Sequence, residues 1–398
     1  MTPGPGVHRT PLPKGFLASG VNCGVRRYRP DIGILISEVP SVAAGVFTLN
    51  ECKAAPVHYS QHLLPADNIK AILTNSGQAN AATGAEGVEK NLMMISATAK
   101  SLNCDMNQVL VASTGVIGVQ LDTDKILPSI PELVSRANDT AESFATAILT
   151  TDLVPKTVTA VVELSTGSVR ITGISKGSGM IHPNMATMLG YILTDAKITK
   201  EHAAELIKKT ADISFNMISV DGDSSTNDCC FLMANGATGV AIKTAEDKEK
   251  FEAIVQDIGV FLAKSIAADG EGATKLIEVE IKGSDNLALA KKAARGVTLS
   301  PLIKTAVHGE DPNWGRILAR LGAEQVPVQQ LEKMTLRLQG VLIFEKGQPV
   351  AFARDEVKAL LKQVQVKIEI DLKSGPHSAT AWGCDLSRKY VDINTEYS

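Results

Sequence analysis

The segment KGSGMIHPNMATML, Lys176 to Leu189, combines residue types that could support nucleophilic chemistry. Two glycines flank a serine, and Pro183 lacks a backbone N–H donor and has a fixed φ. The segment is therefore expected to form a specifically shaped loop rather than a helix. If that loop presents the Ala186 carbonyl to the Thr187 hydroxyl, an N-to-O acyl shift followed by hydrolysis cuts the chain between them.

Such a cut would leave Thr187 with a side-chain hydroxyl and a free α-amine on the same residue. An α-amine has a pKa of about 7.7–8.0, so a desolvated one can accept the hydroxyl proton near neutral pH. Thr187 would then be a nucleophile with its own base. Residue types alone do not establish this chemistry, because any strand can begin with threonine.

Two other polar motifs have simpler interpretations. KGSG differs from a phosphate-binding loop because Lys176 precedes both glycines, whereas the P-loop lysine follows the second one. The segment DGDSSTND, Asp221 to Asp228, has Thr226 where a calcium loop needs its turn glycine. It is better interpreted as a structural or substrate-shaping polar loop.

Histidine and cysteine residues offer further candidates, which we interpret as structural. His308 could be a base, but a lone histidine near acids is more often a hydrogen-bonded structural group, and no G-x-S-x-G motif accompanies it. Cys229 and Cys230 lie in an apolar run, where burial would leave a thiol inert. The six cysteines form no C-x-x-C pair, which argues against a zinc site and predicts no bound metal.

The composition is typical of a globular protein that acts on small molecules. The chain has 398 residues, 44% of them hydrophobic and 21% charged, with a net charge of −3. Its lysines and arginines form no basic stripe, which argues against a nucleic-acid or membrane partner. The N-terminus lacks the apolar region of a signal peptide, and we expect a cytoplasmic protein.

Helical and strand-like patterns alternate along the chain. Residues 89–103 and 244–267 have helical patterns, the second with acids in its first turn. Residues 107–114, 157–175 and 274–284 are β-branched and predict strands. Residues 333–350 predict a hairpin, 355–363 a helix, and 364–375 and 377–394 further strands.

The lack of evenly spaced βαβ units and of G-x-G-x-x-G favours sheets with helices packed on their outer faces over a doubly wound fold. Domain borders are weakly marked, and the GSDN segment near residue 284 is the best candidate. We therefore expect one domain over residues 1–283 and a smaller α/β domain over residues 284–398.

KGSGMIHPNMATML resembles the self-cleavage segment of the ornithine acetyltransferase family, the glutamate N-acetyltransferases of arginine biosynthesis. Other segments resemble family blocks in the same order along the chain, namely GFLASGVNCGVR, AAGVFTLN, TNSGQANAATG, STGVIG, TTDLVPK, VDGDSSTNDCC, DGEGATK, GEDPNWGR and INTEYS. One departure is Gln78, where asparagine is expected. The resemblance implies an αββα-like sandwich with a smaller C-terminal α/β domain.

The resemblance also implies a mechanism. The precursor splits between Ala186 and Thr187 into chains 1–186 and 187–398, which remain associated, and an α2β2 heterotetramer is expected. Thr187 carries the acetyl group from N2-acetylornithine to glutamate in a ping-pong exchange. Thr114 and Gly115 stabilise the oxyanion through a hydroxyl and a backbone N–H.

Substrate-binding residues in the family correspond to Thr150 or Thr151, Lys176, Thr187, Glu271, Asn394 and Ser398. Lys176 can meet a carboxylate and Glu271 the side-chain ammonium of ornithine. Without the resemblance, Lys176 and Glu271 could equally be solvated loop residues. The segment 382–394 is expected to be a strand that brings Asn394 to the end of a sheet.

Alternatives to this function remain. A threonine-nucleophile amidase or aminopeptidase would differ only in letting water attack the acetyl-enzyme. A non-catalytic amino-acid-binding protein would keep the fold without the cleavage. No cofactor is expected, and the sequence leaves open whether acetyl-CoA also serves as a donor, which would make the enzyme bifunctional.

Overall fold

The computed structural model describes residues 9–182 and 188–395, and these residues form two compact units. The first unit contains residues 9–177, 188–211 and 224–262. The second contains residues 178–182, 212–223 and 263–395. The predicted domain border at residues 283/284 stays a prediction, and the predicted cleavage point lies outside the described residues.

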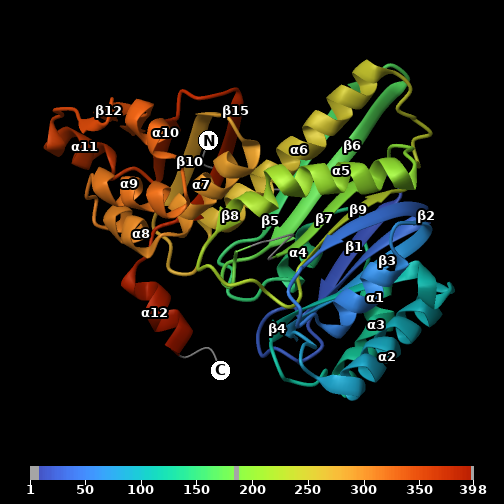
Figure 1. The fold of residues 1–398 in the computed structure, drawn as a ribbon. Helices are drawn as coiled ribbons and strands as arrows, with labels where there is room; N and C mark the ends of the chain where they lie inside the picture. The colour runs from blue at the N-terminus through green and yellow to red at the C-terminus, as the bar shows by residue number, and fades with distance from the viewer. Residues whose placement is uncertain (1–8, 183–187, 396–398) are drawn as a thin grey trace. The chain divides into compact units, whose positions relative to one another are not determined.

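The first unit is built on an eight-stranded sheet with the order β4-β3-β2-β9-β7-β6-β5, and β1 lies beside β2 (Figure 1). The pairs β3/β4 and β7/β9 are parallel, and the other neighbours are antiparallel. The strands are β1 (Phe16–Val21), β2 (Ile32–Phe47), β3 (Ala66–Gln78), β4 (Val109–Val116), β5 (Lys156–Leu164), β6 (Gly167–Lys176), β7 (Leu189–Thr194) and β9 (Cys229–Ala234).

Strand β2 connects two layers of this sheet. Residues 32–36 pair with β1 and β3, and residues 42–47 pair with β9, while Ser41 and Ala43 still have partners in β3. The register is irregular between Ile36 and Ser41, and Pro40 lies within this irregular stretch. A proline cannot donate to a sheet ladder, so it is tolerated at such a bulge. The long strand therefore passes from one layer to the other at this point.

Alternating side chains divide the first unit into two cores. On one face of β2, β3 and β4, the side chains share a core with residues of β6, β7 and β9; this core includes Leu35, Ile72, Leu110, Ile174, Tyr191 and Phe231. On the other face of β2, β3 and β4, side chains that include Ile34, Leu73 and Val111 pack with residues of the helices outside this layer. Because the strand period is two, the two layers enclose one core and each presents its other face to helices. The predicted αββα-like sandwich is confirmed.

The helices α2, α3, α5 and α6 lie on the outer faces of the two layers (Figure 1), whereas Phe144 of α4 packs in the core between them. α2 and α3 contribute to the core outside β2 and β3. On the other layer, a side chain at Gly173 of β6 would collide with Ile258 and Leu262 of α6, so the helix packs closely there. The bounds are α1 (Ala55–Leu63), α2 (Gly84–Leu102), η1 (Met106–Gln108), α3 (Thr123–Ser135), α4 (Glu142–Ala147), α5 (Lys200–Ile213) and α6 (Ala245–Ala268).

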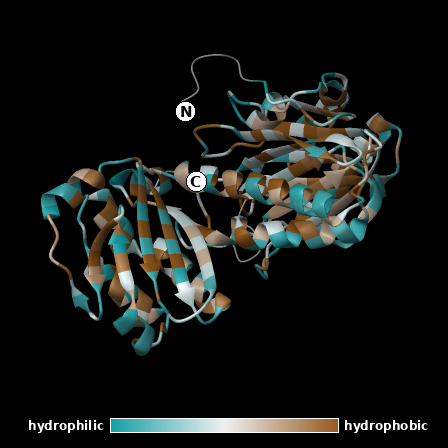
Figure 2. Cartoon of the chain, turned by 90° about the horizontal axis from the view of Figure 1, so that it is seen from above, coloured by the Kyte–Doolittle hydropathy of each residue, from teal (hydrophilic) through white to brown (hydrophobic). Residues whose placement is uncertain are grey.

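The second unit contains a seven-stranded mixed sheet with the order β13-β12-β11-β14-β10-β15-β8. Hydrophobic and hydrophilic residues alternate along several of its strands (Figure 2), as expected for strands with one face in a core. Its strands are β8 (Ile218–Ser219), β10 (Leu276–Ser284), β11 (Thr335–Leu338), β12 (Val341–Glu345), β13 (Gln348–Pro349), β14 (Gln365–Asp371) and β15 (His377–Cys384).

The helical part of the second unit packs around this sheet, with α7 against β10 and β15. The helical elements are η2 (Phe215–Met217), α7 (Leu287–Leu299), α8 (Pro301–His308), α9 (Trp314–Ala323), α10 (Val328–Lys333), α11 (Arg354–Leu360) and α12 (Arg388–Thr395). Across residues 9–182 and 188–395, none of the helices is both long and apolar enough to span a membrane.

The predicted helices and strands are largely confirmed, with one error near the C-terminus. Residues 382–394 were expected to form a strand, but β15 ends at Cys384 and Asn394 lies in the helix α12. Ser387 caps this helix by accepting a hydrogen bond from the backbone N–H of Lys389 at 3.2 Å. A serine at this position starts a helix, and this local signal outweighs the strand propensity of Tyr390 and Val391.

Candidate active site

Thr114 and Gly115 lie at a bulge where the parallel strands β3 and β4 end. Gln78 of β3 pairs with both Thr114 and Val116, so the register shifts there. Gly115 has φ +137°, and a Cβ at this position would lie 2.2 Å from the carbonyl carbon of Gly77. Only glycine fits this close approach of two backbones. The two residues assigned to the oxyanion site therefore occupy a distorted strand end rather than an ordinary turn.

Lys176, the last residue of β6, reaches this strand end. Its Nζ donates a hydrogen bond to Thr114 Oγ1 at 3.1 Å, and the residue is 7% exposed. The alternative interpretation of Lys176 as a solvated loop lysine is therefore wrong. Because an ammonium group can only donate, Thr114 Oγ1 is the acceptor, and its own hydrogen points elsewhere. That hydrogen can be donated to a developing oxyanion.

The segment with Thr150 and Thr151 is tied to Lys176 through a buried carboxylate. Asp152 accepts hydrogen bonds from the backbone N–H of Thr150 at 3.1 Å and of Gly177 at 2.7 Å. Arg26 donates to the carbonyl oxygens of Leu149 and Thr150. Both threonines are half-buried, and the choice between them as the substrate contact stays open.

Part of the polar loop 221–228 supports the strand end that carries Thr114. Asn227 is 5% exposed, and its Nδ2 donates to the carbonyl oxygens of Ser113 at 2.9 Å and Ala79 at 2.5 Å. These two carbonyls flank the bulge between β3 and β4. The interpretation of this loop as a structural one is confirmed for Asn227.

In the second unit, Glu271 and Asn394 are brought together. Asn394 Nδ2 donates to Glu271 Oε2 at 2.8 Å, and Glu271 is 6% exposed. The interpretation of Glu271 as a solvated residue is therefore also wrong. A Cβ at Gly179 would lie 2.3 Å from the Glu271 carboxylate, so the chain can approach this carboxylate only with glycine there.

Asp221 holds the loop that follows Gly179. Its two carboxylate oxygens accept hydrogen bonds from the backbone N–H groups of Met180 at 2.6 Å and Ile181 at 2.8 Å. Met180 has φ +55°, a left-handed conformation that is uncommon for a residue with a side chain. Burial raises the pKa of Asp221, although hydrogen bonds from the backbone oppose the rise. The carboxylate thus stabilises a strained backbone shape.

His182 ends this loop in a defined tautomer. Arg295 Nη2 lies 3.1 Å from His182 Nε2, and Ser219 Oγ lies 3.1 Å from Nδ1. Since a guanidinium can only donate, Nε2 accepts and Nδ1 carries the proton. Burial, followed by the charge of Arg295, lowers the pKa of His182 to about 4. The ring is therefore neutral at neutral pH.

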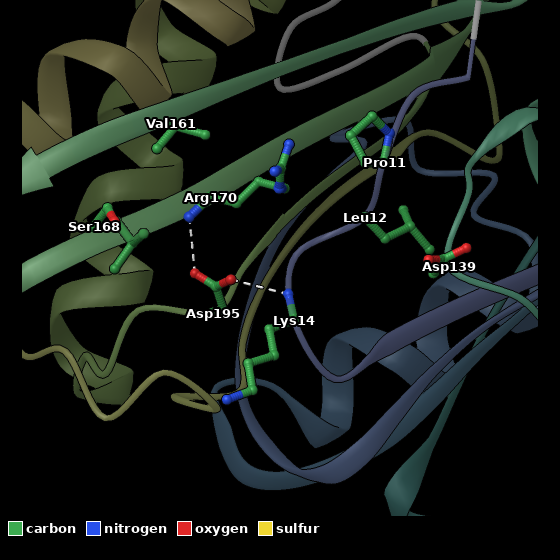
Figure 3. A pocket seen from close by; sticks show the side chains of 9 residues that line it. Pro11, Leu12, Lys14, Asp139, Val161, Ser168, Arg170 and Asp195 are labelled. Carbon is green, nitrogen blue, oxygen red and sulfur yellow. Dashed lines mark hydrogen bonds between the residues drawn. The ribbon is translucent and has the colours of Figure 1, made fainter.

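The first unit also contains a pocket of about 400 Å³ that none of the predicted site residues lines (Figure 3). Asp195 lies within this pocket. Its carboxylate accepts hydrogen bonds from the backbone N–H groups of Lys14 at 2.9 Å and Arg170 at 2.8 Å. These bonds join the N-terminal segment to β6. The carboxylate therefore has a structural role that the fold itself explains.

A model of the ArgJ family matches residues 17–398 of the chain. The arginine biosynthesis bifunctional protein ArgJ of Thermotoga neapolitana is 45% identical, over 97% of this chain and 99% of that protein.

The chain belongs to the ArgJ family.

A second relative agrees with this assignment. The protein of the same name from Oceanobacillus iheyensis is 44% identical, over 97% of this chain and 95% of its own. A solved structure of ornithine acetyltransferase complexed with ornithine, from Mycobacterium tuberculosis, is 36% identical, covers 44% of this chain and 94% of its own, and has a TM-score of 0.41. The expected membership of a family of arginine biosynthesis is confirmed.

Three residues predicted for the ArgJ site lie outside the described ranges. They are Ala186 and Thr187 at the cleavage point and Ser398 at the C-terminus. Their assigned roles stay predictions. The described residues on the two sides of the predicted cleavage point differ in structure. Residues 178–182 form the irregular loop held by Asp221, and β7 begins as a buried strand at Leu189.

We interpreted His308, Cys229 and Cys230 as structural residues, and their surroundings in this ArgJ chain agree with that interpretation. His308 Nδ1 lies 2.7 Å from Asp385 Oδ2, and Asp385 also accepts bonds from the Thr274 and Lys275 backbone. Cys229 and Cys230 are buried, and burial raises the pKa of both thiols. Within the described residues, no group of three or more His, Cys, Asp or Glu is arranged to hold a metal ion.

The sequence prediction missed three residues that contact the segments carrying the predicted site residues. They are Asp152, Asp221 and His182. The sequence offers only a weak signal for each. Asp152 and Lys156 have i,i+4 spacing, but they form their ion pair outside a helix. Asp221 lies in a motif rich in acids, where nothing distinguishes it from Asp223 before the fold is known.

Proposed function

We propose that this chain is a glutamate N-acetyltransferase that moves the acetyl group of N2-acetylornithine to glutamate, giving ornithine and N-acetylglutamate. Thr187 attacks the acetyl carbonyl carbon, and its proton passes to its own α-amine. The C–N bond to ornithine then breaks, and the leaving amine takes a proton. Glutamate attacks the resulting acetyl-Thr187 in the second half of the reaction.

The contact between Lys176 and Thr114 is the observation that best supports this proposal. Lys176 Nζ occupies one lone pair of Thr114 Oγ1, so the hydroxyl is polarised and its hydrogen is oriented before substrate arrives. Preorganised donors of this kind stabilise a tetrahedral oxyanion at little reorganisation cost. Gly115, held beside Gly77 by the bulge, would supply the second donor through its backbone N–H.

Two charged residues suit an amino-acid substrate with two ionised groups. Lys176 would bind the α-carboxylate of acetylornithine, and Glu271, oriented by Asn394, would bind its side-chain ammonium. Thr150 or Thr151, Thr187 and Ser398 complete the proposed set of binding residues. The reaction needs no metal or bound cofactor in this proposal.

Self-cleavage between Ala186 and Thr187 precedes catalysis in this proposal. The fragments 1–186 and 187–398 stay together, and two copies of each form an α2β2 heterotetramer. We also propose a cytoplasmic location. Acetyl-CoA as a second donor would make the enzyme bifunctional. The names of the two relatives call those proteins bifunctional.

The direct test incubates the purified protein with N2-acetylornithine and glutamate and measures both N-acetylglutamate and free acetate. The proposal predicts that N-acetylglutamate forms in step with ornithine. Release of acetate instead would assign the chain to the amidases, in which water attacks the acetyl-enzyme. An intact chain that binds ornithine without turnover would make it a binding protein. A parallel reaction with acetyl-CoA and glutamate, followed by release of CoA, tests the second donor.

A further inference from the structure

Asp152 is a buried carboxylate in the first unit to which the proposed reaction assigns no role. It is 1% exposed and follows the half-buried pair Thr150 and Thr151, just before β5 begins at Lys156. Placing a charge in such a position is costly unless partners compensate for its lost hydration. The partners of Asp152 therefore indicate what the residue does.

Two of these partners are backbone amides from different segments of the chain. The Thr150 N–H donates to one carboxylate oxygen, and the Gly177 N–H, directly after Lys176, donates to the other. Asp152 thus fixes the end of β6 relative to the threonine segment. Since Lys176 and one of these threonines are predicted substrate contacts, one carboxylate sets the position of both segments.

Two lysines also interact with this carboxylate. Lys156 Nζ donates to Asp152 Oδ1 at 2.8 Å, and both side chains are at most 1% exposed. Burial alone would raise the pKa of Asp152, but the charges of Lys176 and Lys156, together with hydrogen bonds from Lys156 and the Gly177 N–H, outweigh burial and lower this pKa to about 2. The carboxylate is therefore ionised at neutral pH and attracts the ammonium of Lys176 as well as that of Lys156.

We propose that Asp152 is a positioning residue for acetyl transfer, which holds Lys176 so that its ammonium stays on Thr114 Oγ1. This inference rests on the proposed function. A lysine side chain has many rotamers, and a fixed counter-charge reduces their number. If the ammonium leaves Thr114, the hydroxyl can rotate and its hydrogen is no longer directed to the oxyanion. Asp152 thereby acts on the reaction only through Lys176.

A merely structural role must be separated from this one, because Asp152 also neutralises the buried Lys156. The variant Asp152→Asn keeps the side-chain shape but removes the negative charge opposite Lys156. The double variant Asp152→Asn/Lys156→Met removes the lysine charge as well. Removing both members of a buried ion pair is usually far less destabilising than removing one. The double variant should therefore regain much of the melting temperature lost in the single variant.

Asp195 provides a matched control. It is 4% exposed and, like Asp152, accepts hydrogen bonds from two backbone amides of the first unit (Figure 3). Neither amide belongs to a predicted site residue. Asp195→Asn should lower the melting temperature without changing kcat. The comparison therefore shows whether losing any buried carboxylate of this unit slows the reaction.

The readout is acetyl transfer from N2-acetylornithine to glutamate, with kcat calculated per cleaved molecule and the melting temperature measured alongside. We expect Asp152→Asn to lower kcat by about 100-fold, the effect that a misplacement of about 1 Å can have. The double variant with Lys156→Met should regain stability while kcat stays low. Adding Asp152→Asn to a Thr114→Ala protein should lower kcat little further, because the two residues act through one contact.

Two results would overturn the inference. One is recovery of full kcat in the double variant, which would make Asp152 only the counter-ion of Lys156. The other is an equal loss of kcat from Asp152→Asn with and without Thr114, which would show that the two residues act independently. Failure of the proposed function is distinguishable, since in that case the unmodified protein itself would form no N-acetylglutamate.

Discussion

The two groups of predicted site residues differ in charge and in how their side chains are fixed. In the first unit, the functional group is a cation, Lys176, which bonds to a hydroxyl and is attracted by the buried carboxylate of Asp152. In the second unit, it is an anion, Glu271, which bonds to the side-chain amide of Asn394. Each charge is buried and already oriented.

This difference predicts that changes in the two groups affect different kinetic parameters. In the first group, the Thr114 hydroxyl and the Gly115 N–H would face a charge formed only during the reaction, so changes to these donors should act mainly on kcat. The second group contains a charge that would meet a permanent ammonium, so its changes should act mainly on binding. The predictions below test whether kinetic effects separate in this way.

The largest effect is expected from Thr114→Ala in the first group. Loss of one oxyanion donor costs about 10²–10³ in kcat. KM for N2-acetylornithine should change much less, because the donor acts in the transition state. The measurement is steady-state kinetics on fully cleaved protein, since cleavage has a tetrahedral intermediate of its own. If KM rises while kcat holds, Thr114 is a ground-state contact and the two groups do not differ as described.

Glu271→Gln should separate the two substrates. The variant keeps a side chain that can bond to Asn394 but lacks the charge for an ammonium partner. Hydrogen bonds to charged groups contribute about 1.5–3 kcal/mol, so kcat/KM for N2-acetylornithine should fall by roughly 10–100-fold. Glutamate has no side-chain ammonium, and its kcat/KM should fall less. Equal losses for both substrates would argue against an ammonium contact at Glu271.

The fixed charge of the first group should also appear as pH-dependent stability. The pKa of Asp152 is lowered from 3.8 to about 2, so its contribution is present above pH 3.8 and is lost as pH falls through about 2. A shift of this size corresponds to about 2 kcal/mol. The stability difference between the unmodified protein and Asp152→Asn should be constant near neutral pH and shrink toward pH 2. Denaturant unfolding across this range measures it, and a difference independent of pH would contradict the charge pairing.

The smallest effect is expected from Asn394→Ala in the second group. The amide orients Glu271 but carries no charge, and a typical hydrogen bond contributes about 0.5–1.5 kcal/mol. kcat/KM for N2-acetylornithine should therefore fall only severalfold, and the same change in a Glu271→Gln background should add little. A full additional loss in that background would show that Asn394 contacts substrate independently of Glu271.

Local patterns predicted much of the fold. The helix over residues 244–267 was recognisable from its acidic first turn, and it appears as α6. The strand run 157–175 appears as the hairpin β5 and β6, because β-branched residues flank a single turn. The strand prediction was wrong for residues 385–394, because the strand propensity of Tyr390 and Val391 was given more weight than the helix start at Ser387.

The site residues were predicted by resemblance, but the contacts between them were not. The bond between Lys176 and Thr114 joins residues that are 62 positions apart, and the one between Asn394 and Glu271 joins residues 123 apart. Such contacts depend on how strands and helices come together, which local periodicity does not encode. Asp152 was not predicted for the same reason. Its proposed role depends on its interactions with Gly177 and Lys176, which lie far from it in the sequence.

The most direct test of the central claim is intact mass spectrometry of the fragment that begins at Thr187, after mixing the protein with N2-acetylornithine in the absence of glutamate. The account predicts that this fragment gains the mass of one acetyl group, located on Thr187 by fragmentation, and loses it when glutamate is added. Thr187→Ala should give an uncut chain that never becomes acetylated. Acetyl transfer to glutamate without an acetylated fragment, or from a fully active uncut chain, would contradict the claim that Thr187 carries the acetyl group.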